Sequence, residues 1–215
     1  MKIKNTALTL GLLIGLSIQT FAGNPDRAGS AGASELLINP WARSSGWAGA
    51  NVSFVRGLEA QYLNVAGTAF TQNTELLFAR TDYLSGTGIS VNAFGLTQKI
   101  GESGVMGVGI MSMGFGDIER TTVEVPEGGI GTFSPKLMNL TFSYAKEFSR
   151  SIYGGMAVKV ISENTSDVTA RGVAFDAGIQ YVTGFSKKNR DNLKFGISLK
   201  NVGPSMKFAG DGLSF

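Results

Sequence analysis

The sequence contains no cysteine and no histidine, and only five of its 215 residues are proline. Without cysteine the chain can form no disulfide and offers no thiolate nucleophile. Without histidine it lacks the commonest general base and the commonest metal ligand. Serine–histidine catalysis, cysteine–histidine catalysis and histidine–cysteine zinc sites are therefore excluded within this chain. We predict that the protein is not an enzyme and carries neither a cofactor nor a metal.

Charged residues are also scarce, at 16% of the chain, with 19 basic and 16 acidic side chains. Two of the basic residues, Lys2 and Lys4, lie at the extreme N-terminus, so the rest of the chain has 17 basic against 16 acidic residues. No basic stripe interleaved with aromatic residues is present. This balance argues against nucleic acid as a partner.

The first 22 residues have the pattern of a secretory signal peptide. Lys2 and Lys4 precede an apolar stretch from Ala7 to Ile18, and Thr20-Phe21-Ala22 offers a small-residue cleavage site before Gly23. The alternative is an N-terminal membrane anchor, but the apolar stretch is shorter than the ~20 residues that a helix needs to cross a bilayer. We therefore expect export through a cleaved signal peptide, residues 1–22.

Glycine is abundant, with 30 residues, and hydrophobic residues make up 43% of the chain. Residues 23–72 show no period of two. Their tryptophans, Trp41 and Trp47, are scattered among glycine, alanine and serine, which favours a short helix and loops packed inside or beneath a larger structure. We call residues 23–72 the hatch segment and expect both tryptophans to pack against the surrounding wall.

From Glu75 onward the pattern is that of β-strands. Between Leu137 and Lys146, apolar and polar or small residues alternate, which places one apolar and one polar face on a strand. The same alternation recurs around Val158, Phe175 and Ile197. Each run is about ten residues long, the length that a tilted strand needs to cross the hydrocarbon of a membrane.

These strands predict an all-β fold, an antiparallel transmembrane β-barrel with about seven strands in residues 73–215. A soluble β-sandwich also alternates, but it does not require strands this long. Tyr144, Tyr181 and Phe195 lie near strand ends on the apolar face, where the aromatic girdles of membrane barrels are found. The expected location is the outer membrane of a Gram-negative cell, with outer-membrane lipid as one partner.

The connections between the predicted strands alternate between short and long. Residues 101–104, 149–151 and 186–192 are tight and polar, whereas Glu119–Pro135 and Ser162–Arg171 are longer and are predicted to be outer loops. Because long outer loops of barrels commonly carry function, Glu119–Pro135 is the candidate for docking a partner.

Four charged residues fall on the polar, lumen-facing side of their strands: Lys159, Asp176, Lys194 and Lys200. Two interpretations are open. The charges are solvated or paired with one another, or they contact the hatch segment, with Arg43 or Glu35 as their candidate partners there.

Several short motifs resemble the PorV/PorQ family, outer-membrane proteins of the type IX secretion system in Bacteroidetes-type bacteria. Residues 39–50 (NPWARSSGWAGA) resemble that family's ARA-x-G-M-G-G-A stretch, with Trp47 in place of methionine. Residues 64–67 (NVAG) resemble its Asn-Pro-Ala-Gly turn, which the long-chain fatty-acid transporters share, with Val65 in place of proline. Residues 114–121 (GFGDIERT) and the strand at 172–178 (GVAFDAG) are also similar to it.

The resemblance implies a barrel of about fourteen strands, of which this sequence holds about half. An eight-stranded barrel whose last strand begins at Met206 and ends at Phe215 is the alternative. The resemblance also implies hatch-motif residues Arg43, Gly46, Gly49, Asn64 and Gly67. It implies docking to other secretion-system outer-membrane subunits and to secreted cargo. Transport of hydrophobic small molecules is the alternative function.

Overall fold

The computed structural model describes residues 30–185 and 191–213. The predicted signal peptide, the first part of the hatch segment, most of the 186–192 connection and Phe215 lie outside the described residues.

The N-terminal part of the described chain is mostly turns and short helices, and the rest is mostly strand. The first elements are β1 (Ser30–Ala31), η2 (Ser34–Leu37), α2 (Ala42–Ser45), α3 (Ala60–Leu63) and η3 (Val65–Phe70). The strands that follow are β2 (Thr74–Asp82), β3 (Ser90–Ile100), β4 (Gly104–Gly114), β5 (Ile118–Glu119), β6 (Thr132–Phe133), β7 (Lys136–Glu147), β8 (Ile152–Thr165), β9 (Val168–Thr183), β10 (Leu193–Val202) and β11 (Met206–Ala209), before η4 (Asp211–Leu213). Among the residues described, no helix has both the length and the apolar character needed to cross a bilayer.

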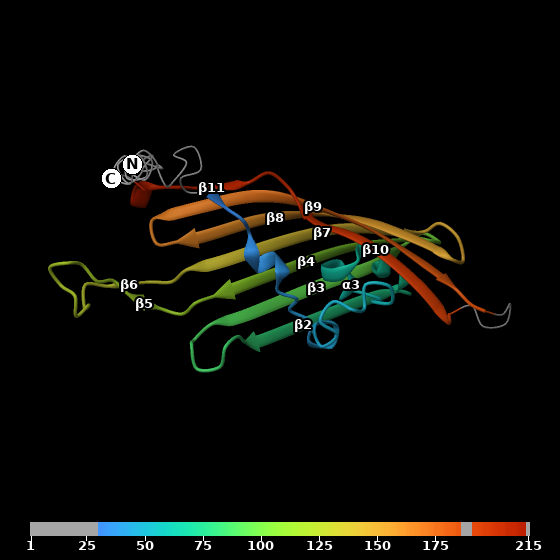
Figure 1. Ribbon diagram of the computed structural model, residues 1–215, viewed down its shortest axis with the longest axis horizontal. Coiled ribbons are helices and arrows are strands. Elements are labelled where there is room, and N and C mark those ends of the chain that lie inside the picture. The colour runs from blue at the N-terminus through green and yellow to red at the C-terminus, as the bar shows by residue number, and fades with distance from the viewer. Residues whose placement is uncertain (1–29, 186–190, 214–215) are drawn as a thin grey trace, which may run out of the picture.

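The long strands form one antiparallel sheet in the order β2-β3-β4-β7-β8-β9, with β10 and β11 both paired to the far edge of β9 (Figure 1). From β2 to β10, each long strand pairs with the next long strand along the chain. The small β5–β6 ladder lies between β4 and β7 in sequence and extends beyond their ends (Figure 1). The fold is therefore all-β and antiparallel, as predicted. Within the described ranges no ladder joins β2 to β10, so the sheet has two free edges.

One face of the sheet, which we call the outward face, is covered with exposed apolar side chains. The strand register aligns them in rows across six strands. One row is Phe78, Phe94, Ile110, Leu140, Val160 and Val173, and the next is Leu76, Leu96, Val108, Phe142, Val158 and Phe175. Most of these side chains are exposed. The alternation seen in the sequence thus places the apolar side chains away from the covered side of the sheet.

The opposite face, which we call the inward face, is covered by the hatch segment (Figure 1). Near β2–β4 the contact is apolar: Trp41, Leu58 and Tyr62 of the hatch pack on residues such as Val91 and Met111. Near β7–β10 it is polar, and the buried side chains there include Asn139, Thr141, Lys159, Asp176 and Gln180. The buried interior of this molecule is consequently more polar than its exposed sheet face.

The predicted loop at Ser162–Arg171 is wrong. Strands β8 and β9 continue through it to a two-residue turn at Ser166 and Asp167, and Ser166 adopts the left-handed conformation that the turn requires (φ 51°). The polar residues of this stretch pair across the hairpin, with Ser162 opposite Arg171. The polar composition of residues 162–171 led to the prediction of a loop. The exposed end of a long hairpin has the same polar composition, so composition alone does not distinguish the two.

The strand predicted to begin at Met206 is not an eighth neighbour in the sheet. β11 pairs with β9, Phe208 opposite Ala170, along the same edge that β10 occupies further down. A register shift between Leu199 and Val202, followed by Gly203-Pro204, separates the two. Because proline cannot donate to a ladder, β10 and β11 are two pieces of one interrupted strand.

Glycines on the inward face let the hatch backbone approach the sheet. A Cβ on Gly196 would lie 2.6 Å from Ser53 Cα and from the Val52 carbonyl oxygen, both backbone atoms of the hatch. We expect Gly196→Ala to lower the free energy of unfolding by about 1–3 kcal/mol, because the hatch must move to admit the methyl group. Urea unfolding of the purified protein measures this.

Gly114→Ala is the matched control, since a Cβ there finds its nearest atom, Ser90 Oγ, at 4.0 Å. It should change stability by less than about 0.5 kcal/mol. Equal effects of the two substitutions would mean that the hatch is not seated on Gly196.

Candidate functional site

The candidate site is the interface between the hatch segment and the inward face, and Asn64 lies at its centre. Asn64 is fully buried and caps η3 by accepting a hydrogen bond from the Ala66 amide at 3.2 Å. Its side-chain amide lies within hydrogen-bond distance of three carbonyl oxygens, Val52 at 3.0 Å, Ile179 at 3.2 Å and Ile197 at 3.4 Å. One side chain therefore connects the hatch to both β9 and β10.

The turn that starts at Asn64 depends on close packing of small residues. A Cβ on Gly178 of β9 would collide with the Asn64 side chain. A Cβ on Gly67 would collide with the Val55 carbonyl oxygen and would lie 2.8 Å from the Ala60 Cβ. Any larger residue at Gly67 would thus open the hatch itself, which gives a physical reason for glycine at this position of the motif.

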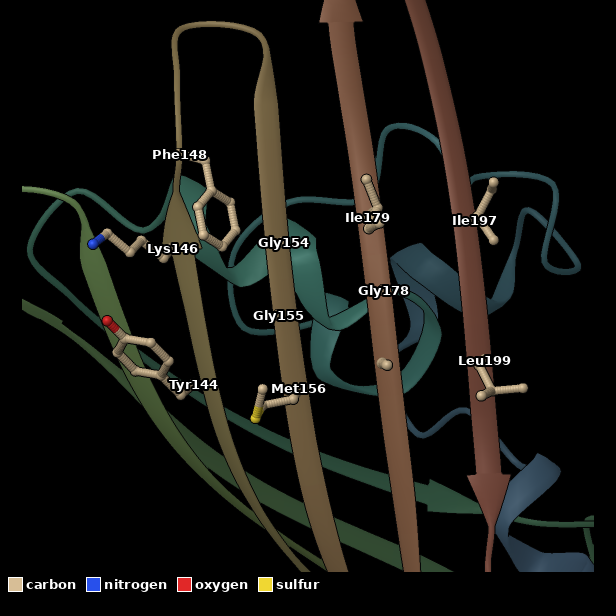
Figure 2. A pocket seen from close by; sticks show the side chains of 11 residues that line it. Tyr144, Lys146, Phe148, Gly154, Gly155, Met156, Gly178, Ile179, Ile197 and Leu199 are labelled. Atoms are coloured by element: carbon tan, nitrogen blue, oxygen red, sulfur yellow. The ribbon is translucent and has the colours of Figure 1, made fainter.

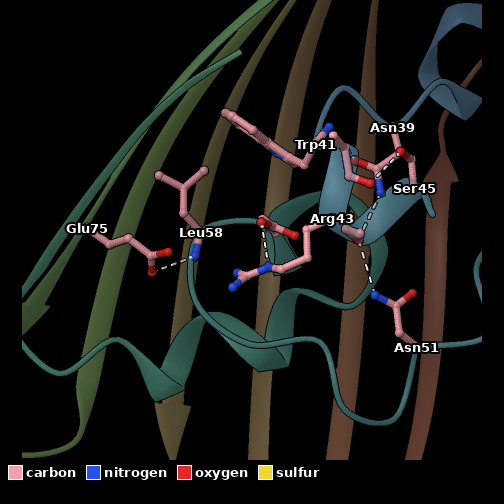
Figure 3. Close-up of polar contacts among 10 residues, drawn as sticks. Asn39, Trp41, Arg43, Ser45, Asn51, Leu58 and Glu75 are labelled. Atoms are coloured by element: carbon pink, nitrogen blue, oxygen red, sulfur yellow. Dashed lines mark hydrogen bonds and ion pairs between the residues drawn. The ribbon is translucent and has the colours of Figure 1, made fainter. Parts of the chain in front are cut away.

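The remaining hatch-motif residues lie at the first short helix and have exposed surroundings. The side chain of Arg43 is 73% exposed, and its Nε donates to Glu59 Oε1 at 3.0 Å (Figure 3). Gly46 caps the end of α2, and Gly49 adopts a left-handed conformation (φ 86°) that favours glycine. These three residues and Gly67 shape the hatch, whereas Asn64 holds it to the sheet.

Further side-chain hydrogen bonds fasten the hatch along its length. Gln61 donates to Ser143 Oγ at 2.8 Å, and Gln180 donates to the carbonyl oxygens of Val52 and Val55 at 3.1 and 3.0 Å. At the β2 edge, the Leu58 amide donates to Glu75 Oε2 at 2.9 Å (Figure 3). The hatch is therefore anchored to β2, β7, β9 and β10.

A buried ion pair lies beside the hatch on the inward face. Lys159 Nζ of β8 and Asp176 Oδ2 of β9 are 2.6 Å apart, and their side chains are 1% and 3% exposed. Asn201 completes the group from β10: its Oδ1 accepts from Lys159 Nζ and its amide N–H donates to Asp176 Oδ1, both at 2.7 Å. Asn201 has a φ of 58°, and its Nδ2 donates to the Leu36 carbonyl oxygen at 3.4 Å. The register shift in β10 thus places Asn201 against both the ion pair and the hatch.

Of the four charges on the inward side, Lys159 and Asp176 pair with each other, as the first interpretation has it. The hatch partners suggested for these charges are wrong: Arg43 pairs with Glu59, and Glu35 lies near Glu163. Lys194, 25% exposed, pairs with Asp191 in the adjoining connection at 3.2 Å. Lys159 and Asp176 are brought together, and Lys194 is not part of their group.

Glu35 is a buried carboxyl in the hatch, and its Oε1 has no hydrogen-bond partner among the described atoms. Burial, together with the nearby carboxylate of Glu163, raises the pKa of Glu35 above its ordinary value and outweighs the hydrogen bond from its own backbone. A raised pKa means that the neutral acid is the better-tolerated form in the folded protein.

The two tryptophans have different environments. Trp41 is 4% exposed and lies edge-on to Tyr62, with ring centroids 6.5 Å apart. Trp47 is 55% exposed and contacts Phe54 of the hatch, so the expectation that it packs against the wall is wrong. Burial, reinforced by the nearby Asp176 carboxylate, raises the pKa of Tyr62, so its hydroxyl stays protonated.

The outward face carries a groove of about 430 Å³ where β7, β8, β9 and β10 lie side by side (Figure 2). Large side chains such as Tyr144, Phe148 and Leu199 border it, and Gly154 and Ala177 leave its floor without bulk. The groove is lined almost wholly by apolar groups and lies on the opposite side of the sheet from the hatch (Figure 2). It suits a hydrocarbon chain better than a polar ligand.

Sequence reasoning missed several residues of this interface, among them Asn201, Tyr62 and Gln61. Asn201 had a detectable signal, because Lys200 and Asn201 are consecutive polar residues in a strand that otherwise alternates. Tyr62 and Gln61 had none, since nothing in the irregular hatch indicates which side chains turn toward the sheet.

No protein-family model matches this sequence, and no curated protein is significantly similar to it.

Removing one partner of the buried ion pair should destabilise the protein strongly. We expect Asp176→Asn to lower the free energy of unfolding by about 3–5 kcal/mol, because Lys159 is left charged and buried without a counter-charge. The double variant Lys159→Met, Asp176→Leu should recover most of that loss, since it removes both charges. Urea unfolding followed by tryptophan fluorescence measures all three proteins.

Asp191→Asn is the control, because it breaks exposed pairs with Arg56 and Lys194. It should cost less than about 1 kcal/mol. If Asp176→Asn costs no more than Asp191→Asn, loss of the buried counter-charge does not destabilise the folded protein.

Proposed function

We propose that this chain forms part of an outer-membrane β-barrel whose inward face lines the lumen and whose hatch segment fills that lumen. The observation that carries the proposal is the distribution of polarity. Rows of apolar side chains are exposed on the outward face, while Lys159 and Asp176 are buried beneath the hatch. Soluble monomers rarely expose a contiguous apolar patch larger than a few hundred Å². Lipid hydrocarbon is the solvent that suits such a face.

Strand length and sheet edges support the same proposal. β3, β4, β7, β8 and β9 have between 11 and 16 residues, long enough to cross the hydrocarbon when tilted. The free edges of β2 and β10 carry backbone groups that lipid cannot satisfy. In the proposed barrel, further strands beyond this sheet pair with those edges and close it.

Within the membrane, the proposed role is that of a non-enzymatic component of type IX protein secretion, exported with a cleaved signal peptide. The resemblance to the PorV/PorQ family supports this role. Of the residues that carry it, Asn64 anchors the hatch to β9 and β10, and Gly67 allows the close packing inside the hatch. The expected partners are other outer-membrane subunits of the system and secreted cargo. The β5–β6 ladder, where Arg120 contacts Phe133 and pairs with Asp167, is the proposed docking element.

Transport of a hydrophobic small molecule is the second candidate function. A cavity of about 550 Å³ lies where β10 breaks off at Gly203-Pro204. It is lined by outward-facing Val173, by inward-facing Ala174 and by Leu36 of the hatch, so it reaches both sides of the sheet at that point.

Deletion of the gene distinguishes the two functions. The secretion role predicts loss of surface-protein export with normal uptake of long-chain fatty acids, because a docking component serves protein cargo. Both quantities are measured in the deletion strain and in a strain complemented with the wild-type gene. Normal export with impaired uptake would exclude the secretion role and favour transport.

The barrel itself is tested by replacing either of two exposed valines with arginine. Val158 lies in an outward row between Phe142 and Phe175, and Val123 is fully exposed in the connection between β5 and β6. In lipid, Val158→Arg should lower stability by about 2–4 kcal/mol and reduce the folded band of a heat-shift gel, because the arginine faces hydrocarbon. Val123→Arg should have almost no effect. Equal behaviour of the two variants would show that water, and not lipid, covers the outward face.

A further inference from the structure

The apolar groove on the outward face owes its shape to two small residues in an otherwise bulky surface. The register from β7 to β10 aligns two outward rows at the groove: Lys146, Gly154, Ile179 and Ile197, and next to it Tyr144, Met156, Ala177 and Leu199. Gly154 and Ala177 leave a gap in these rows. The rows on either side, which contain Phe142 and Tyr181, have neither glycine nor alanine from β7 to β9. The groove is therefore a local hollow in the outward face.

Two polar tips border this hollow at its β7 wall. In Figure 2 the Lys146 ammonium and the Tyr144 hydroxyl extend toward the same side, away from β8. The Tyr144 hydroxyl reaches β4, since a Cβ on Gly104 would lie 3.0 Å from it. Neither tip has a hydrogen bond or an ion pair with another described residue. Two hydrogen-bond donors without a protein acceptor thus lie beside an apolar hollow.

Lys146 is also isolated in charge on this part of the outward face. Among the described strand residues, the outward positions from the row of Phe142 to the turn after β7 carry one charged side chain, that of Lys146. This turn, residues 149–151, is short, and short turns lie on the periplasmic side of outer-membrane barrels. A lysine there keeps its aliphatic stem on apolar surface and its ammonium among the lipid headgroups. Anionic headgroups of the inner leaflet are complementary to it.

We propose that the groove binds an acyl chain of an anionic glycerophospholipid whose phosphate accepts hydrogen bonds from Lys146 and Tyr144. A phosphate offers a negative charge and several acceptor oxygens to these two donors. At roughly 30 Å³ for each methylene, about the space of one liquid water, the 430 Å³ of the groove holds roughly fourteen methylenes, most of one acyl chain. The uncompensated positive charge favours a lipid of net negative charge over a zwitterionic one. The proposal rests on the proposed placement of the outward face in lipid.

The test uses the full chain in phosphatidylcholine vesicles that contain a small fraction of phosphatidylglycerol with a photoreactive diazirine in its acyl chain. Labelled positions are identified by mass spectrometry of the peptides. We expect Met156 and Leu199, in the groove, to be labelled about fivefold more than Phe94, which lies outward on β3 and outside the lining. A phosphatidylcholine with the same photoreactive chain should label the three positions about equally.

Lys146→Gln should lower the labelling of the groove by phosphatidylglycerol about fivefold, the factor expected for one basic residue near an anionic membrane surface. Lys136→Gln is the matched control, because Lys136 lies outward at the opposite end of the same strand, and it should label as the parent does. Ala177→Phe fills the groove with an apolar ring and should remove the selective labelling. Val160→Phe, outward but outside the lining, should leave it unchanged.

The outcomes separate the lipid site from the barrel on which it rests. Equal labelling of Met156, Leu199 and Phe94 by phosphatidylglycerol overturns the site and leaves the outward face in lipid. Labelling of Phe94 alone also overturns it, because another protein surface, such as a second copy of this chain, then covers the groove. If no outward residue is labelled, the barrel is contradicted and the lipid site with it. Selective labelling that persists in Lys146→Gln overturns the assignment of the phosphate.

Discussion

The hatch backbone lies so close to the sheet that side-chain bulk on the inward face would separate them, and this contact constrains the rest of the structure. Gly178 and Gly196 leave room for Asn64 and for the backbone at Val52 and Ser53. The Asn64 amide then reaches the carbonyl groups of both β9 and β10. Because Asn64 also caps η3, the conformation of the hatch and its position on the sheet are set by the same side chain.

The buried ion pair follows from that arrangement. Lys159 and Asp176 are buried beside the hatch, and Asn201 binds both of them as well as Leu36 of the hatch. The pair contributes little net free energy relative to an apolar pair, but either member alone would be very unfavourable. Lys200 adds a positive charge that the pair does not neutralise.

Much of the fold could be predicted from the sequence because the strands alternate so regularly. In β7, the apolar positions Met138, Leu140, Phe142 and Tyr144 all lie outward, as their spacing implied. Strand ends were harder, since the polar tips of β8 and β9 have the composition of a loop. The interruption of β10 at Gly203-Pro204 depends on pairing with β9, which no local pattern reports. The hatch was the least predictable part, because short helices without a regular period give no sign of which side chains face the sheet. Arg43 and Trp47 are exposed to solvent.

The hatch is attached at both ends to opposite edges of the sheet. Ser30 and Ala31 pair with β11 at one edge, and the chain leaves the hatch directly into β2 at the other. The intervening residues therefore link the two edges of the sheet across its inward face. A folded hatch spans a fixed distance, so it limits how far apart the two edges can move and opposes flattening of the sheet between them. Unfolding of its internal turns would lengthen this link and let the sheet flatten, without detaching either end.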